Sequence, residues 1–130
     1  MKVKRVKNID LKKIVKQSQS IQAQVGFFGS AKYEDGTQVA YVASIQEFGN
    51  IQKNIPPRPF MRPAKDNNIA QWKNIFAKAT TNAIKNNNSI KGAFDIIALT
   101  AEGDIKKAIK AVTKPALKTA TVEARLRGKK

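Results

Sequence analysis

The sequence predicts an α+β fold, in which a small sheet packs with several helices, including one long helix after a Pro-rich segment. Apolar residues recur at three- and four-residue spacing over residues 60–85, which is typical of a long helix with one apolar face. Four of the five prolines fall within residues 56–63, just before and at the start of that stretch. A short apolar stretch at residues 25–28 predicts a strand. The length of 130 residues and the hydrophobic content of 42% fit a single domain, residues 1–130, with basic terminal extensions.

Two helices and a turn are expected in the first third of the sequence. Residues 9–21 place apolar side chains among Lys and Gln at the spacing of an amphipathic helix, with Asn8 as candidate N-cap. Residues 33–37, YEDGT, contain an Asp-Gly pair and predict a turn. Residues 39–48 form a predicted helix that ends at a glycine, and its apolar residues recur at every third position: Val39, Val42, Ile45 and Phe48.

Residues 55–63, IPPRPFMRP, form a stiff stretch that we call the proline segment. Each proline fixes its own φ and disfavours the α conformation for the residue before it, so residues 55–58 are expected to be extended. A segment that is rigid before docking loses little entropy on binding, and arginine and aromatic residues often dominate interface energy. We therefore predict an interface here, formed by Glu47, Phe48, Ile55, Pro56, Pro57, Arg58, Pro59, Phe60 and Arg62.

The arginines of the proline segment allow two interpretations. Guanidinium groups make bidentate contacts with carboxylates, so Arg58 or Arg62 is expected to pair with an acidic group of a neighbouring chain. The alternative is an ion pair within the chain, for which Glu47 is the candidate. Glu47 itself is either a solvated helix residue or a contact at a surface corner.

Further helices are expected in the second half. The long predicted helix over residues 60–85 carries Trp72 on its apolar face, where we expect it to lie in the core. Residues 86–89 break this helix, and Ser89 is the candidate cap of a second helix that extends to about Val112. Residues 119–126 fit either a short helix capped by Thr119 or a strand.

The residues available for catalysis are few. The sequence contains no cysteine and no histidine, which removes thiolate chemistry, the commonest general base and the commonest metal ligand. The adjacent Glu34 and Asp35 are explained by the predicted turn, and Glu102 and Asp104 point to different faces of a helix. No phosphate-binding glycine motif occurs. We therefore predict that the chain is not an enzyme and holds no metal or cofactor.

The net charge of +16 is concentrated at the two ends of the sequence. Residues 1–16 contain seven Lys or Arg and one Asp, and residues 106–130 contain nine Lys or Arg and one Glu. Such a charge implies an acidic partner, although lysine-rich ends that only keep the protein soluble are the alternative. The residues predicted to bind that partner are Lys2, Lys4, Arg5, Lys7, Arg125, Arg127, Lys129 and Lys130.

The sequence also lacks the marks of a membrane or secreted protein. No apolar run approaches the roughly 20 residues that cross a bilayer, and the N-terminal residues lack a hydrophobic signal core. We expect a soluble protein made in a cytoplasm, without membrane contact.

The middle of the chain resembles the tail-completion proteins of tailed bacteriophages, which join head to tail at the neck and are also described as virion morphogenesis proteins. The resemblance rests on a DGT turn, a VAxxxEFG helix and the IPPRPFMRP segment, with a weaker echo in a GDIxxAI helix and a PxLKxxT element within residues 103–121. It covers about three quarters of the chain, from Val25 onward. One departure is that such proteins commonly continue with a DTG-containing strand region, whereas this sequence ends at Lys130, as a short member or a part of that fold would.

The resemblance implies a virion structural protein at the neck or tail, made in the host cytoplasm and without catalysis. It implies a homo-oligomeric ring, six-fold as in tails, that contacts neck or connector proteins and tail tube or tail terminator proteins. The alternative function is a basic nucleic-acid-binding accessory protein. Because lysine outnumbers arginine and aromatic residues are absent from the basic ends, such binding would act through phosphate contacts rather than base stacking.

Overall fold

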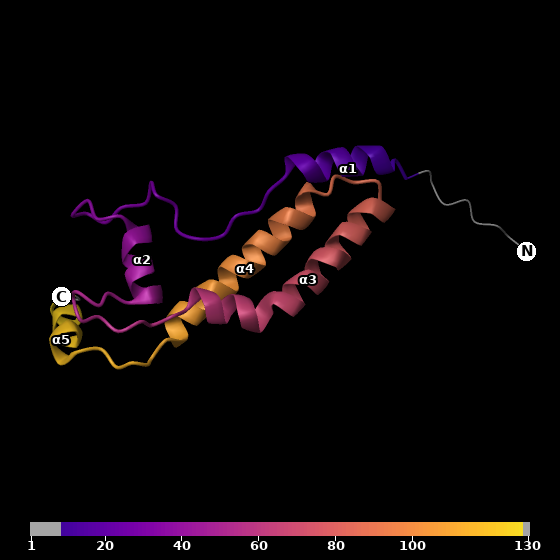
Figure 1. The fold of residues 1–130 in the computed structure, drawn as a ribbon. Helices are drawn as coiled ribbons and strands as arrows, with labels where there is room; N and C mark the ends of the chain where they lie inside the picture. The colour runs from indigo at the N-terminus through magenta and orange to yellow at the C-terminus, as the bar shows by residue number, and fades with distance from the viewer. Residues whose placement is uncertain (1–8, 129–130) are drawn as a thin grey trace, which may run out of the picture. The chain divides into compact units, whose positions relative to one another are not determined.

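A computed structural model of the chain describes residues 9–128. Its helices are α1 Leu11–Ser20, α2 Val39–Phe48, α3 Met61–Lys85, α4 Lys91–Ala111 and α5 Thr119–Arg127 (Figure 1). Several residues predicted to form the basic binding site lie outside the described residues: Lys2, Lys4, Arg5, Lys7, Lys129 and Lys130.

The predicted α+β fold class is wrong: residues 9–128 form five helices and no sheet, and only 3% of residues are in strand conformation. The predicted strand at residues 25–28 has no partner strand among residues 9–128, and a single strand without a partner is not stable on its own. Two isolated bridges, Lys32 with Gln38 and Asn50 with Ile55, take the place of a ladder. The bridge between Lys32 and Gln38 cannot be extended into a hairpin, because α2 begins at Val39, directly after Gln38.

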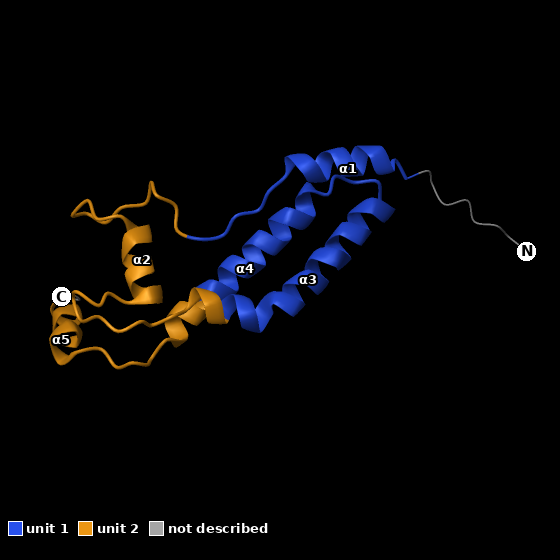
Figure 2. Ribbon diagram, in the orientation of Figure 1, with its two compact units in different colours: residues 1–26, 64–106 blue, residues 27–63, 107–130 orange. Residues whose placement is uncertain are grey.

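The chain divides into two compact units (Figure 2). Unit 1 comprises residues 1–26 and 64–106, and unit 2 comprises residues 27–63 and 107–130. Helices α3 and α4 each contribute residues to both units. The single domain predicted for residues 1–130 remains a prediction.

Unit 1 is a helical hairpin with apolar packing between α3 and α4. Phe76 and Phe94 meet edge to face with ring centroids 5.0 Å apart. Trp72 is half-buried, and its Nε1–H donates to a carboxylate oxygen of Asp104 over 2.9 Å. The buried apolar residues of this unit are Ala64, Ile90, Ala93, Ala101 and Ile105. Small side chains at most of these positions allow the two helices to approach closely.

The ends of the unit 1 helices follow from local hydrogen bonds. Helix α1 begins after Asp10, whose carboxylate accepts from the Lys13 N–H over 3.1 Å, so the N-cap is Asp10 rather than the predicted Asn8. Between α3 and α4, Asn87 adopts a positive φ of 55°. The Ser89 hydroxyl then accepts from the N–H of Lys91, the first residue of α4.

Unit 2 contains α2, the proline segment and α5, with the last residues of α4. The predicted turn before α2 is formed by Asp35, whose carboxylate accepts from the Thr37 N–H over 2.9 Å, and by Gly36 at a φ of 82°. Residues 119–127 are helical, so the strand alternative for this stretch is excluded. No helix within residues 9–128 is long and apolar enough to span a membrane.

Candidate functional site

The candidate site is built around Glu47, the one buried charged residue among residues 9–128. Glu47 is the penultimate residue of α2, and its side chain is 6% exposed. One carboxylate oxygen accepts from the Phe60 N–H over 2.8 Å and from the Met61 N–H over 2.9 Å. The other accepts from the Arg62 N–H over 3.2 Å and from the Arg62 side-chain Nε over 2.9 Å.

This arrangement makes Glu47 the N-terminal cap of α3. The first N–H groups of a helix have no partner within the helix, and they carry the positive end of its dipole. Helix α3 begins at Met61 after Pro59 and Phe60, and neither of those side chains can accept a hydrogen bond. A carboxylate brought from α2 satisfies three of these donors and supplies the negative charge that the dipole favours.

The environment of Glu47 favours its charged form. Burial by itself raises the pKa of this carboxyl group. Hydrogen bonds from the Met61 N–H, the Arg62 side chain and the Phe60 N–H outweigh burial and lower the pKa from 4.5 to about 2. Glu47 is therefore ionised throughout the neutral and mildly acidic range.

Arg62 is paired within the chain. In addition to the contact of its Nε with Glu47, its Nη2 donates to the Glu47 backbone carbonyl over 3.3 Å. The guanidinium carbon lies 5.1 Å from the centre of the Phe48 ring, in a cation–π contact. Of the two interpretations offered by the sequence, the intramolecular ion pair with Glu47 describes Arg62 in this structure.

A tight turn joins α2 to the proline segment, and we call residues 48–55 the corner. Gly49 has a φ of 75° and a ψ of −179°, a combination that essentially only glycine adopts. A Cβ atom there would lie 2.7 Å from the Ile55 carbonyl oxygen. Asn50 and Ile55 exchange two backbone hydrogen bonds of 2.8 and 2.9 Å, which close the turn. The shape of the corner is thus fixed by bonds within one chain.

Arg58 is also held from two sides. Its backbone N–H donates to the Gln46 carbonyl over 2.6 Å, and its Nη2 donates to the Ala116 carbonyl over 2.6 Å. Its Nε is buried without a hydrogen-bond partner among the described residues. The side chain therefore links the proline segment to the stretch between α4 and α5 and retains an unused donor.

The predicted interface residues differ in exposure. Phe60 is buried at 6% and meets Phe27 edge to face at 5.9 Å, so its apolar surroundings lie within its own chain. Phe48 is 67% exposed, and Ile55, Pro56, Pro57 and Pro59 are exposed as well. Sequence reasoning missed Ile51, which is fully exposed at the tip of the corner. The prediction that these residues form an interface stays a prediction.

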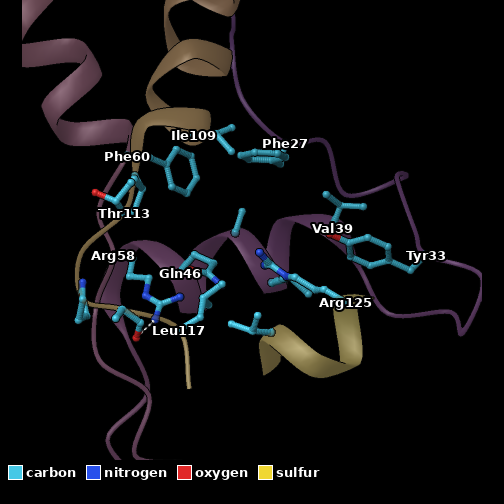
Figure 3. Close-up of a pocket in the computed structure, with 16 residues that line it drawn as sticks. Phe27, Tyr33, Val39, Gln46, Arg58, Phe60, Ile109, Thr113, Leu117 and Arg125 are labelled. Atoms are coloured by element: carbon cyan, nitrogen blue, oxygen red, sulfur yellow. Dashed lines mark hydrogen bonds between the residues drawn. The ribbon is translucent and has the colours of Figure 1, made fainter. Parts of the chain in front are cut away.

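A cavity of about 710 Å³ lies within unit 2 (Figure 3). Its walls come from α2, the proline segment, the end of α4, the stretch before α5, and α5 itself. They are mostly apolar. Arg58 and Arg125 are the charged residues that line it, and both side chains extend into it in Figure 3. Arg127, the other predicted basic residue within the described range, pairs with Glu123 over 3.8 Å instead.

The charged groups of the site are engaged in hydrogen bonds within the chain. Among residues 9–128 no cluster of three or more carboxylates, the metal-binding side chains available in this sequence, could hold a metal ion. The polar groups of the site, Glu47, Arg58 and Arg62, are bonded to backbone groups or to one another. Comparison with protein-family models, with curated proteins and with solved structures found no match for this chain.

Proposed function

We propose that the chain is a virion structural protein of a tailed phage, a ring-forming adaptor that completes the tail and joins it to the head connector. The resemblance of residues 35–63 to tail-completion proteins suggests this role. The observation that carries the proposal is the corner. It presents exposed apolar side chains on a backbone whose shape is already set by Glu47 and Gly49.

The corner should dock at a low cost in entropy. An exposed apolar cluster on a soluble chain marks a contact site, and a rigid one loses less entropy when it docks. A ring requires a heterologous interface, in which a projecting element of one subunit meets a different surface of the next. In the corner, Ile51 is 100% exposed and Phe48 is 67% exposed, so both are available for such a contact.

Electron microscopy of particles that contain this chain tests the proposal. We expect density for several copies in a closed ring at the junction of head and tail. A single copy per particle, an open filament, or a position away from the neck and tail would contradict it.

A variant can test the corner itself. Ile51→Asp should leave the monomer folded, since Ile51 buries no surface, and should reduce the fraction of heads joined to tails. Leu99→Asp is the matched control, because Leu99 is an apolar residue of α4 that is 68% exposed. A normal fraction of joined heads with Ile51→Asp, or an equal reduction with both variants, would contradict a role of the corner in the contact between subunits. Arg58→Ala is a poorer test of the interface, because loss of this side chain also breaks its hydrogen bond to the Ala116 carbonyl within the chain.

The net charge of +16 favours a second candidate, nucleic-acid binding through phosphates. A salt titration of duplex DNA binding separates the two functions. A protein that acts through phosphates should lose affinity steeply as salt rises, with a slope that reflects the number of phosphates contacted. For an adaptor we expect weak binding to DNA in the unassembled state.

A further inference from the structure

We propose that the unit 2 cavity binds a segment of an acidic partner protein that presents an apolar side chain beside a carboxylate. The proposal does not rest on ring formation or on the phage assignment, because all lining residues belong to one unit of one chain. A volume of about 710 Å³ is within the range of protein sites that enclose a ligand, and it exceeds what one side chain fills.

The walls determine the apolar half of the ligand. Val39, Val42 and Ala43 line the cavity from α2, and Val122 lines it from α5. Phe60 closes one end together with Phe27 (Figure 3). Walls of this kind favour an aliphatic or aromatic side chain, which gains free energy when it leaves water.

The charged residues of the cavity determine the polar half of the ligand. Arg58 and Arg125 line the cavity, and no carboxylate within residues 9–128 does. The Nη2 of Arg58 already donates to the Ala116 carbonyl and its Nε is buried away from solvent, so Arg58 contributes positive charge to the cavity rather than a free donor. Among residues 9–128 Arg125 makes no ion pair, whereas Arg127 on the same helix pairs with Glu123. A carboxylate in the cavity would give Arg125 an acceptor and would be attracted by the positive charge of both guanidinium groups.

Charge also selects the kind of partner. A second copy of this chain, with its net charge of +16, would bring further positive charge toward two arginines. Nucleic acid carries a charge on every nucleotide and matches a mostly apolar cavity poorly. An acidic protein segment with an apolar side chain satisfies both the walls and the arginines.

Fluorescence anisotropy with labelled synthetic peptides tests this proposal on the full chain. The probe is a short peptide in which Asp and Glu flank a central Leu-Phe pair. One control peptide replaces Leu-Phe by Ser-Ser, and another replaces every acid by its amide. Binding of the acidic, apolar peptide well above both controls is the expected result.

Two variants locate the binding. Arg125→Gln should weaken binding of the acidic, apolar peptide about tenfold, as expected for the loss of a charge-assisted hydrogen bond. Arg127→Gln is the matched control, since it removes the same charge from the same helix outside the cavity. Ala43→Leu should weaken binding by filling the cavity. Circular dichroism checks that each variant remains helical.

Several outcomes would overturn the proposal. Equal losses with Arg125→Gln and Arg127→Gln would mean general charge attraction. Equal binding of the Ser-Ser peptide would mean that the apolar walls play no part. Binding of laurate or duplex DNA at the cavity without binding of the peptide would assign it to a fatty acid or to nucleic acid. Binding of none of these probes would leave the cavity without the proposed role.

Discussion

Unit 1 and unit 2 are each stabilised by a different kind of interaction within the unit. Unit 1 buries apolar residues between two long helices, and its Trp72–Asp104 hydrogen bond and Phe76–Phe94 contact lie in that packing. Unit 2 buries Phe60 and Glu47, and contains a cavity that is open to solvent. Its backbone is fixed largely by one carboxylate and by arginine contacts with carbonyl groups.

This difference has consequences for stability. Apolar packing is distributed over many contacts, so single changes on its surface cost little. A buried carboxylate that satisfies several donors concentrates stability in one residue, because its removal leaves all of them unpaired at once. Unit 2, which carries the corner and the cavity, should therefore be the more sensitive unit.

The largest effect is expected for Glu47→Ala. It leaves the N–H groups of Phe60, Met61 and Arg62 without their acceptor, and at about 1 kcal/mol for each hydrogen bond the loss should be about 3 kcal/mol. Urea unfolding followed by circular dichroism measures the loss, and hydrogen exchange should show faster exchange of these amides. Glu102→Ala is the control. Its exposed ion pair with Lys106 contributes at most about 1 kcal/mol, so a comparable loss in both variants would refute the special role of Glu47.

Acid should weaken unit 2 through the same residue. The pKa of Glu47 is lowered in the folded state, so its contribution is fully present above about pH 4.5 and is lost as the pH falls toward about 2. The difference between the two pKa values corresponds to a contribution on the order of 3 kcal/mol. Hydrogen exchange at stepwise lower pH, corrected for the intrinsic exchange rate, should show loss of protection at residues 60–62. The Glu47→Gln variant should lack this dependence, and an identical acid response of both proteins would contradict the assignment.

The next effect concerns the backbone of the corner. Gly49→Ala introduces a Cβ atom 2.7 Å from the Ile55 carbonyl oxygen and forces an unfavourable φ, which together should cost about 2–3 kcal/mol. Gly36→Ala is the control, because Gly36 has a similar φ of 82° but no atom within 4 Å of the added Cβ. We expect it to cost about 1 kcal/mol. Equal unfolding midpoints for the two variants would show that the close approach at Gly49 does not matter.

The sequence could predict features that depend on local spacing, but not those that depend on contacts between distant residues. Helices α2, α3 and α4 were predicted because the spacing of their apolar residues is a local property. The strand prediction failed because a strand requires a partner that may lie anywhere in the chain. The cap of α3 was missed for a similar reason, since Glu47 lies 13 residues before Phe60. One signal was available: neither Pro59 nor Phe60, just before α3, carries a capping side chain, so the helix required an acceptor from elsewhere.

The site itself was predicted in part. The sequence singled out Glu47, Arg58 and Arg62 and left open whether they bind partners or one another. Many of the hydrogen-bonding groups of these three side chains are used within the chain. The carbonyl that accepts from Arg58 belongs to Ala116, 58 residues away, so no local sequence pattern could have predicted this bond. The exposed Ile51 was missed because a single apolar residue between polar neighbours shows no periodicity.

The smallest effect should have the opposite sign and lie in unit 1. Gly103 is within α4, and a Cβ atom there would meet no atom within 4 Å. Alanine in a helix interior restricts the unfolded chain and favours the helix, so Gly103→Ala should raise the free energy of unfolding by about 0.5–1 kcal/mol. Chemical denaturation followed by Trp72 fluorescence suits this test, since the only tryptophan of the chain lies in unit 1. A loss of stability would mean that α3 and α4 pack more tightly around Gly103 than this structure indicates, and the contrast between a tolerant unit 1 and a sensitive unit 2 would then fail.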